Sequence, residues 1–233
     1  MSRTSREYRN EAEKNMVGRF GDVILYLVLT AVVSSGIVWL ARYFGPVLDI
    51  NGNIISPGLP FMVTILSIIG LLYNSAIAYS TASVFIDITE KESFNVWEKI
   101  KLGFINDFAR NIILQLVQSI FIVLWSMLFI IPGIVKSYAY SMTFYIAVKE
   151  PEQKGIDAIT KSKNLMNGKK GDLFFLDFSY FWWYLLGLLT FGILWFWIFP
   201  KHMTARTIFF NDVYNASLKH DPAKKNMIQE PLF

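Results

Sequence analysis

Hydrophobic residues are gathered into four long blocks along the chain, and polar, basic segments separate the blocks. Asp22–Phe44 and Leu59–Ile86 are each long enough for one crossing of a membrane, because about 20 mainly apolar residues span roughly 30 Å of hydrocarbon. The other two blocks, Ile112–Val148 and Leu173–Tyr214, are too long for one crossing. The pattern therefore predicts an integral membrane protein with several spans.

Proline and glycine divide each of the two longer blocks. Pro132-Gly133 interrupts the third block, and the fourth is interrupted near Gly192 and again at Pro200. These residues favour a tight return turn between two helices. The sequence thus predicts an all-α, polytopic helical bundle with six transmembrane helices arranged as three hairpins. Whether the last turn lies near Gly192 or near Pro200 stays open.

Basic residues predict how such a bundle is oriented. Most of the 22 lysines and arginines lie in the amino-terminal segment, the connections after the second and fourth spans, and the carboxyl-terminal tail. With six crossings all of these segments share one side, which the positive-inside rule assigns to the cytoplasm. We therefore expect both termini in the cytoplasm. The basic residues left for the other face or for the bundle interior are Arg42, Lys136, Lys201 and Arg206.

Composition agrees with a membrane protein and offers little chemistry. The chain is 54% hydrophobic and 17% charged, whereas soluble domains average about 25% charged residues. It has no cysteine, which excludes disulfides and thiolate metal sites. No metal-ligand spacing or glycine-rich phosphate loop is present, so we predict no cofactor, no metal and no catalytic set. The net charge of +4 suits anionic lipid rather than nucleic acid.

A glycine stands four residues before an aspartate at three places, each just ahead of an apolar block. The pairs are Gly18 with Asp22, Gly103 with Asp107, and Gly168 with Asp172. An amphipathic stretch precedes each pair, with apolar stripes at helical spacing. These stripes are Tyr8, Ala12, Met16 and Phe20 in the first stretch, Trp97, Ile100, Phe104 and Phe108 in the second, and Ile156, Ile159 and Leu165 or Met166 in the third.

Two interpretations of this pattern remain open. The chain either contains three copies of one unit, an interfacial helix followed by a helical hairpin, or only reuses the same caps at helix ends. On the first interpretation the pseudo-repeats cover about residues 8–88, 92–149 and 152–215 of a single membrane domain, 1–216. Residues 217–233 are polar and contain two prolines, so we expect a disordered cytoplasmic tail.

Polar residues inside the apolar blocks are candidates for function, because ionisable groups are costly within a membrane. The basic groups that follow Pro132 and Pro200 suggest an anion-attracting vestibule for a lipid headgroup or an acidic substrate. Alternatively, these cations snorkel to the membrane interface. Asp177 is expected to pair with Arg206 or with the third span, or alternatively to carry a proton. The candidate intramembrane polar site comprises Lys136, Asp177, Lys201, His202, Arg206, Asn111, Gln115 and Gln118. The last three share one helix face, which favours interhelical hydrogen bonds over a polar substrate path.

Several segments of the chain resemble a family of Gram-positive bacterial membrane proteins known as DUF975. The resemblance is carried by residues 131–134 (IPGI), 138–145 (YAYSMTFY), 158–168 (AITKSKNLMNG), 182–187 (WWYLLG) and 200–206 (PKHMTAR). It implies a bacterial cell membrane and a multi-span α fold, with a more remote similarity to membrane domains beside some glycerophosphodiester phosphodiesterases. It implies no activity and no catalytic residue.

Three classes of function follow from these observations. The first is a non-enzymatic membrane protein that organises or assists lipids, a partner membrane protein or a second copy of itself, using interfacial helices on the inner leaflet. The alternative is a transporter or flippase-like conduit for a lipid or amphiphile, since carriers share internal repeats and broken helices. An intramembrane enzyme is the least supported, because no nucleophile–base pair is present.

Overall fold

The computed structural model describes residues 3–48, 51–106, 108–128, 130–153 and 155–220, and most of them are helical. The remaining described residues form turns and loops and two short antiparallel strands. The elements in chain order are α1 (Ser5–Met16), α2 (Phe20–Tyr43), β1 (Val47–Leu48), β2 (Ile54–Ser56), α3 (Pro60–Glu90), α4 (Val96–Ile105), α5 (Phe108–Leu128), α6 (Ile130–Tyr140), α7 (Thr143–Lys149), α8 (Gly155–Leu165), α9 (Lys170–Leu189) and α10 (Trp195–His220).

Among the described residues, three helices are long and apolar enough to cross a membrane: α2, α3 and residues Phe108–Met127 of α5. The helical membrane protein predicted from sequence is therefore supported, but the count of six spans is not. The third apolar block contains most of α5 and is broken again at Ser141 and Met142, between α6 and α7. The 11 residues of α6 measure about 16 Å at 1.5 Å per residue, about half of the roughly 30 Å of hydrocarbon.

The last turn, left open by the sequence, lies at Gly192. α9 ends at Leu189 and α10 begins at Trp195, and between them Phe191 and Gly192 both have positive φ, of 51° and 85°. Pro200 lies inside α10. α10 continues to His220, so the first residues of the expected tail are helical, and residues 221–233 lie outside the described residues.

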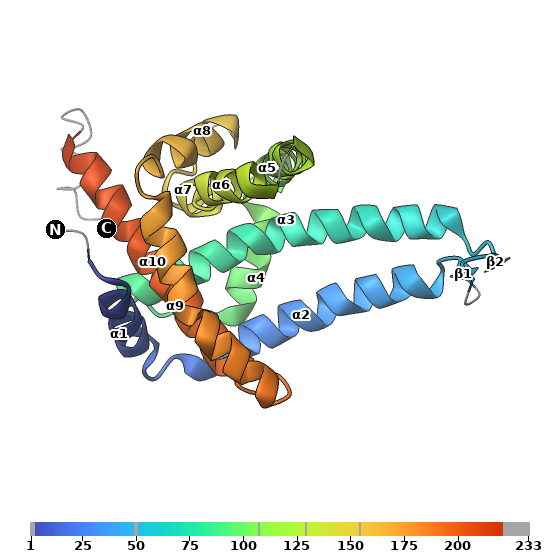
Figure 1. Cartoon of the computed structure of the whole chain (residues 1–233), viewed down its shortest axis with the longest axis horizontal. Helices are drawn as coiled ribbons and strands as arrows, with labels where there is room; N and C mark the ends of the chain where they lie inside the picture. Colours follow the sequence, from blue (N-terminus) through green and yellow to red (C-terminus); the bar gives the residue numbers. More distant parts are fainter. Residues whose placement is uncertain (1–2, 49–50, 107, 129, 154, 221–233) are drawn as a thin grey trace.

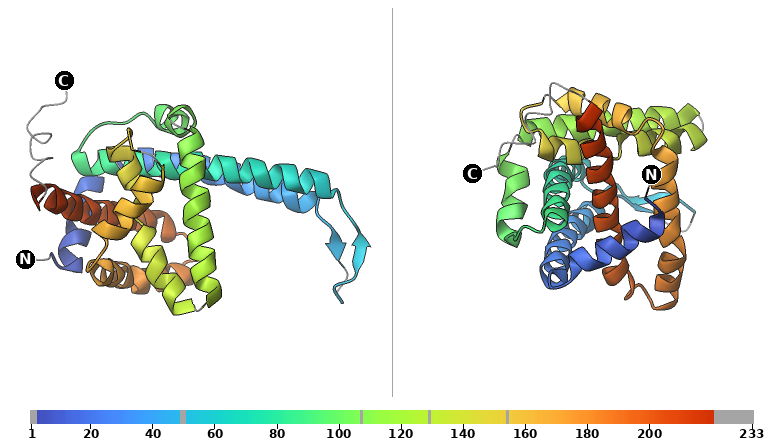
Figure 2. Two further views of the ribbon diagram at one scale, coloured as in Figure 1. Left: turned by 90° about the horizontal axis from the view of Figure 1, so that it is seen from above. Right: turned by 90° about the vertical axis from the view of Figure 1, so that its left-hand side faces the viewer.

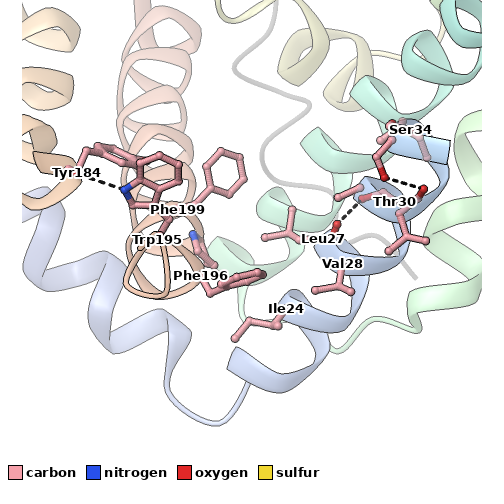
Figure 3. Close-up of a pocket in the computed structure, with 15 residues that line it drawn as sticks. Ile24, Leu27, Val28, Thr30, Ser34, Tyr184, Trp195, Phe196 and Phe199 are labelled. Atoms are coloured by element: carbon pink, nitrogen blue, oxygen red, sulfur yellow. Dashed lines mark hydrogen bonds between the residues drawn. The ribbon is translucent and has the colours of Figure 1, made fainter. Parts of the chain in front are cut away.

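Helices α2 and α3 form an arm that projects away from the rest, with β1 and β2 at its tip (Figure 1). The pairs α5–α6 and α9–α10 run in other directions (Figure 2). The three helix pairs therefore diverge from one another. The divergence of α2 from α9–α10 leaves a groove between them (Figure 3).

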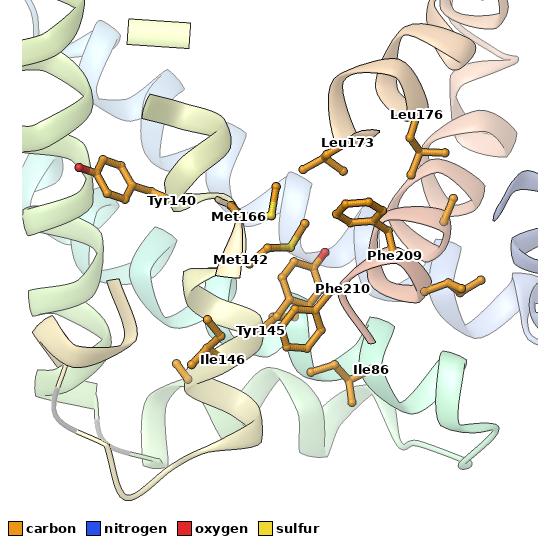
Figure 4. Close-up of a cluster of buried hydrophobic side chains, with 14 of the residues drawn as sticks. Ile86, Tyr140, Met142, Tyr145, Ile146, Met166, Leu173, Leu176, Phe209 and Phe210 are labelled. Atoms are coloured by element: carbon orange, nitrogen blue, oxygen red, sulfur yellow. The ribbon is translucent and has the colours of Figure 1, made fainter. Parts of the chain in front are cut away.

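The buried core lies where these helix pairs converge. Phe209 and Phe210 of α10 pack there with side chains of α7, α8 and α9 (Figure 4). Two ring contacts tie α10 to other helices: Tyr145 stacks on Phe210 at 5.3 Å, and Tyr8 meets Phe209 edge-on at 5.6 Å between ring centroids. The outer parts of the helices expose many large apolar side chains, as lipid-facing surfaces do.

α1 is anchored along α10. It begins with a capping box in which the Thr4 backbone and hydroxyl bond to Glu7, and these hydrogen bonds lower the pKa of the Glu7 carboxyl. Its buried stripe contains Tyr8, Ala12 and Met16, as the sequence pattern predicts. Burial raises the pKa of the Tyr8 phenol, and the carboxylate of Asp212 on α10 adds to this.

The turns at Gly18 and Gly168 have the same geometry. Gly18 has φ of 77° and Gly168 has φ of 74°. In both turns the residue after the glycine donates its N–H to the carbonyl oxygen of a buried methionine that stands two residues before the glycine. The acceptors are Met16 at 3.1 Å and Met166 at 3.2 Å. The α1–α2 and α8–α9 junctions therefore share one local structure, as either a duplication or a reused helix cap would give.

The segment around Gly103 is different. Gly103 lies inside α4 without a positive φ, and α4 ends at Ile105 with Asn106 as its C-cap. Asp107 lies outside the described residues. Trp97 and Phe104 of the expected stripe are exposed, whereas Val96 and Gly103 are buried. Periodicity predicted an apolar face formed by a stripe of large residues. α4 packs on α3 through Gly103 instead, because glycine allows the closest approach of two helices.

We expect Gly18→Ala and Gly168→Ala to reduce the free energy of unfolding by similar amounts, about 1–2 kcal/mol each. Nothing lies within 4 Å of a Cβ at either position, so the cost arises from forcing alanine into the left-handed region. Detergent denaturation followed by tryptophan fluorescence measures it. Gly21→Ala, in open space within α2, is the control and should not destabilise; clearly unequal losses at Gly18 and Gly168 would contradict a shared turn.

Candidate functional site

A polar cluster centred on Asp177 joins α9 to α10. An Asp177 carboxylate oxygen lies 2.8 Å from Nε2 of His202 and 3.5 Å from Nε of Arg206. His202 and Arg206 are four residues apart on α10, so they project from the same helix face. The three side chains are only 14–25% exposed. The cluster thus keeps one carboxylate and one cation largely shielded from solvent.

Two tyrosines of α9 hold His202 in place. The Tyr184 hydroxyl lies 3.0 Å from Nδ1 of His202, and the Tyr180 ring stacks on the imidazole with centroids 4.5 Å apart. Both imidazole nitrogens therefore have hydrogen-bond partners. A neutral His202 satisfies both when Nε2–H donates to Asp177 and Nδ1 accepts from Tyr184. This continuous path from phenol to carboxylate is chemically able to carry a proton.

Lys201 points instead toward α1. Its ammonium group lies 2.6 Å from a carboxylate oxygen of Glu13, and Arg9 donates to the carbonyl of Ser179 on α9 at 3.0 Å. The count of basic residues left Lys201 for the other membrane face or for the bundle interior. The structure instead places it beside the amino-terminal helix. Sequence reasoning missed this because it treated α1 as a separate interfacial helix.

The other predicted polar residues lie elsewhere in the fold. The ammonium group of Lys136 stands 4.2 Å from the ring centroid of Trp125, across the α5–α6 pair. Asn111 donates from Nδ2 to the carbonyls of Gly103 at 3.3 Å and Asn106 at 3.1 Å.

Gln115 of α5 donates to Ser119 at 3.4 Å. Gln118 Oε1 and Asn111 Oδ1 are buried without a hydrogen-bond partner among the described residues. The eight candidates therefore separate into several places, and only Asp177, His202 and Arg206 make direct contact as one site.

Two polar features were not found from the sequence. The first is Tyr180 and Tyr184, which follow Asp177 by three and seven residues, the spacing of one helix face, but were not among the predicted site residues. The second is Asp87 near the end of α3, whose carboxylate lies 2.6 Å from the ammonium of Lys99 on α4. Lys99 also donates to Ser83 at 2.8 Å, so this pair fixes α4 on α3.

An apolar groove of about 760 Å³ lies between α2 and the α9–α10 turn (Figure 3). One wall is formed by α2 and the other by aromatic side chains around Gly192. Tyr184 belongs to the second wall, and its hydroxyl reaches His202, so the groove borders the polar cluster. The Tyr184 carbonyl also accepts a hydrogen bond of 3.1 Å from Trp195 Nε1. The principal lining residues are Ile24, Leu27, Val28, Ala31, Ser35, Tyr184, Trp195, Phe196 and Phe199.

Comparison with known proteins gives one partial match. Residues 129–217 match the model of a family described as "Protein of unknown function (DUF975)". No curated protein and no solved structure matches the chain. The matched part contains Asp177, His202 and Arg206, so it is the segment carrying the polar cluster that is similar to the DUF975 family.

Proposed function

We propose that this chain is a non-enzymatic integral membrane protein that organises lipids, and through them partner proteins, by holding an amphiphile between α2 and the α9–α10 pair. The observation that carries the proposal is the groove of about 760 Å³ and its almost entirely apolar lining. Ligand cavities in proteins usually measure about 300–1,000 Å³. The groove is therefore large enough for part of an acyl chain.

The chemistry of the groove favours an amphiphile over a purely apolar molecule. Apolar side chains of α2 face aromatic side chains of α10 across the groove. Its margin is formed by Tyr184, which bonds to His202 of the polar cluster. An occupant that places its chain in the groove and a polar group near Tyr184 satisfies both surfaces, because buried polar groups require hydrogen-bond partners.

We further propose a bacterial cell membrane location, with both termini on the cytoplasmic side, and a Gram-positive source as the resemblance implies. Arg3, just before α1, and Glu13 of α1 form ion pairs of 3.1 Å and 2.6 Å with Asp212 and Lys201 of α10. Because α1 and α10 pack together, an even number of crossings between them fits best. Six crossings remain the proposal that also gathers the basic connections on the inner side.

A conduit for the same amphiphile is the second candidate, and one observation favours it. Asp177 and Arg206 are largely shielded charges in a helix pair that also contains Pro200, and such groups mark substrate paths in carriers. This hypothesis requires lipid movement between leaflets of reconstituted vesicles. The organising function requires only stable binding.

Filling the groove tests the proposal. We expect Ala31→Trp to lower the amount of co-purifying amphiphile about tenfold, because displacing two buried CH2 groups costs about 1.6 kcal/mol. Val33→Trp is the matched control, since Val33 lies on the same helix, is 48% exposed and does not line the groove. The measurement is mass spectrometry of lipids and proteins bound to the full chain in native-lipid nanodiscs.

Equal amphiphile content in wild type, Ala31→Trp and Val33→Trp would contradict a site in the groove. Loss in both variants would indicate a general effect of surface tryptophan and would contradict it as well. A protein partner retained by wild type and lost only with Ala31→Trp would support an organising role exerted through the bound amphiphile.

A further inference from the structure

A second and smaller cavity lies between α1 and the α9–α10 pair. Its volume is about 250 Å³, and it shares no lining residue with the groove. That volume is below the usual range of about 300–1,000 Å³ for whole small-molecule ligands, so it suits a headgroup better than a complete lipid. The side chains that give it chemical character are Arg9, Glu13, Tyr180, Trp183, Trp197 and Lys201.

Positive charge exceeds negative charge around this cavity. Arg9 is oriented by its hydrogen bond of 3.0 Å to the Ser179 carbonyl, which uses one of the five N–H donors of its guanidinium. Lys201 is oriented by Glu13 at 2.6 Å. Two cations therefore face one carboxylate, and the Glu13 side chain is itself 64% exposed. A second anion would complete the charge balance.

Aromatic side chains form the rest of the wall. Trp183 and Trp197 are 48% and 55% exposed, and the Trp197 ring stacks on Phe20 at 5.1 Å. Tryptophan is favoured at the level of lipid headgroups because its ring is apolar and its N–H is polar. α1 buries an apolar stripe and carries basic residues elsewhere, which is typical of a helix lying in the membrane interface. The cavity thus combines cations and tryptophan at the position of an interfacial helix.

We infer that this cavity binds the phosphate headgroup of an anionic phospholipid, with Arg9 and Lys201 contacting the phosphate and the acyl chains leaving over Trp183 and Trp197. Charge-assisted hydrogen bonds from arginine and lysine are the common means of binding phosphate. The inference goes beyond the proposed function, because the groove and this cavity are built from different residues.

Substituting Glu13 and substituting Lys201 should change the affinity for an anionic lipid in opposite directions. Glu13 and a lipid phosphate compete for Lys201, so Glu13→Gln should increase affinity for an anionic lipid. Lys201→Gln should decrease it. Both variants break the same ion pair, and a pair that only fastens α1 to α10 would respond alike to both.

The experiment titrates the full chain in neutral detergent with phosphatidylglycerol or phosphatidylcholine and measures bound lipid by native mass spectrometry. We expect a preference for phosphatidylglycerol that falls about tenfold or more in Arg9→Gln/Lys201→Gln. The matched control, Arg6→Gln/Lys14→Gln, removes the same charge from exposed positions of α1 that do not line the cavity. It should change affinity by about twofold or less. Arg9→Lys/Lys201→Arg should retain most of the binding.

Three results would overturn the inference. The first is loss of binding in both Glu13→Gln and Lys201→Gln. The second is equal loss in the cavity and control double variants. The third is full competition by inorganic phosphate together with no preference between the two lipids, which would assign the site to free phosphate. If Arg9→Gln/Lys201→Gln does not fold, the affinity of Glu13→Gln for phosphatidylglycerol still tests the inference, because the inference requires that affinity to increase.

Failure of this site and failure of the groove give different results. Ala31→Trp should leave phosphatidylglycerol affinity at the cavity unchanged, and Arg9→Gln/Lys201→Gln should leave the amphiphile in the groove.

Discussion

Gly103→Ala is expected to lower the free energy of unfolding by about 3 kcal/mol, at the upper end of the usual cost of overpacking. A Cβ on Gly103 would lie 2.1 Å from the carbonyl oxygen of Ala76 and 2.7 Å from its carbonyl carbon. Both contacts are with the α3 backbone, which has no rotamer with which to yield. α4 must therefore move away from α3, weakening the Asp87–Lys99 ion pair. Detergent denaturation monitored by tryptophan fluorescence measures the loss.

Gly171→Ala is the control for this substitution. Gly171 lies in the first turn of α9, and nothing stands within 4 Å of its Cβ position. Alanine is favoured over glycine in a helix by about 1 kcal/mol or less, so the control should be neutral or stabilising. If Gly103→Ala were tolerated as well as Gly171→Ala, the close approach of α4 to α3 would be wrong.

Asp177→Leu is expected to cost about 3 kcal/mol. Removing the carboxylate leaves the guanidinium of Arg206 without its ion-pair partner and Nε2 of His202 without an acceptor, and an uncompensated buried charge typically costs about 3–5 kcal/mol. The lower value is chosen because the three side chains keep 14–25% exposure. The same denaturation measurement applies.

Two further variants separate the ion pair from other effects. Asp172→Leu removes an exposed carboxylate of the same helix whose partner Lys169 lies 3.6 Å away, and should change stability by about 0.5 kcal/mol or less. The double variant Asp177→Leu/Arg206→Met should be more stable than Asp177→Leu, because no unpaired cation remains. A double variant at least as unstable as the sum of both single losses would contradict the ion pair.

The helices that the sequence predicts best are those fixed by apolar length alone. Asp22–Phe44 and Leu59–Ile86 correspond to α2 (Phe20–Tyr43) and α3 (Pro60–Glu90), because a segment of that composition has no alternative to a helix in lipid. Gly18 and Gly168, which the sequence analysis singled out, lie in turns, because glycine adopts a positive φ without strain.

The arrangement of these helices could not be predicted in the same way. Lipid and protein interior are equally apolar, so the pattern of α9 does not distinguish Leu176, which is buried, from Phe175, which is 65% exposed. For that reason the divergence of the helix pairs could not be predicted from the apolar pattern. The number of spans could not be fixed from the pattern either, because Ile112–Val148 is one apolar block although its chain breaks at Ser141 and Met142.

The candidate site was predictable where charge was involved. The sequence singled out Asp177, His202 and Arg206 because ionisable residues are rare in apolar blocks, and it proposed the contact of Asp177 with Arg206 that the structure shows at 3.5 Å. It did not connect Tyr184 with them. The phenol is neutral and common in these blocks, so only the three-dimensional pairing with His202 distinguishes it.

The contact between α1 and α10 has a consequence for the order in which the chain assembles. Tyr8 meets Phe209, and Arg3 meets Asp212, so α1 is synthesised before the helix against which it packs. Until α10 is made, we expect the apolar stripe of α1 to be buried in the membrane interface. The stripe of α1 can be buried in the fold only after α10 has been made, so we expect the packing of α1 to depend on α10.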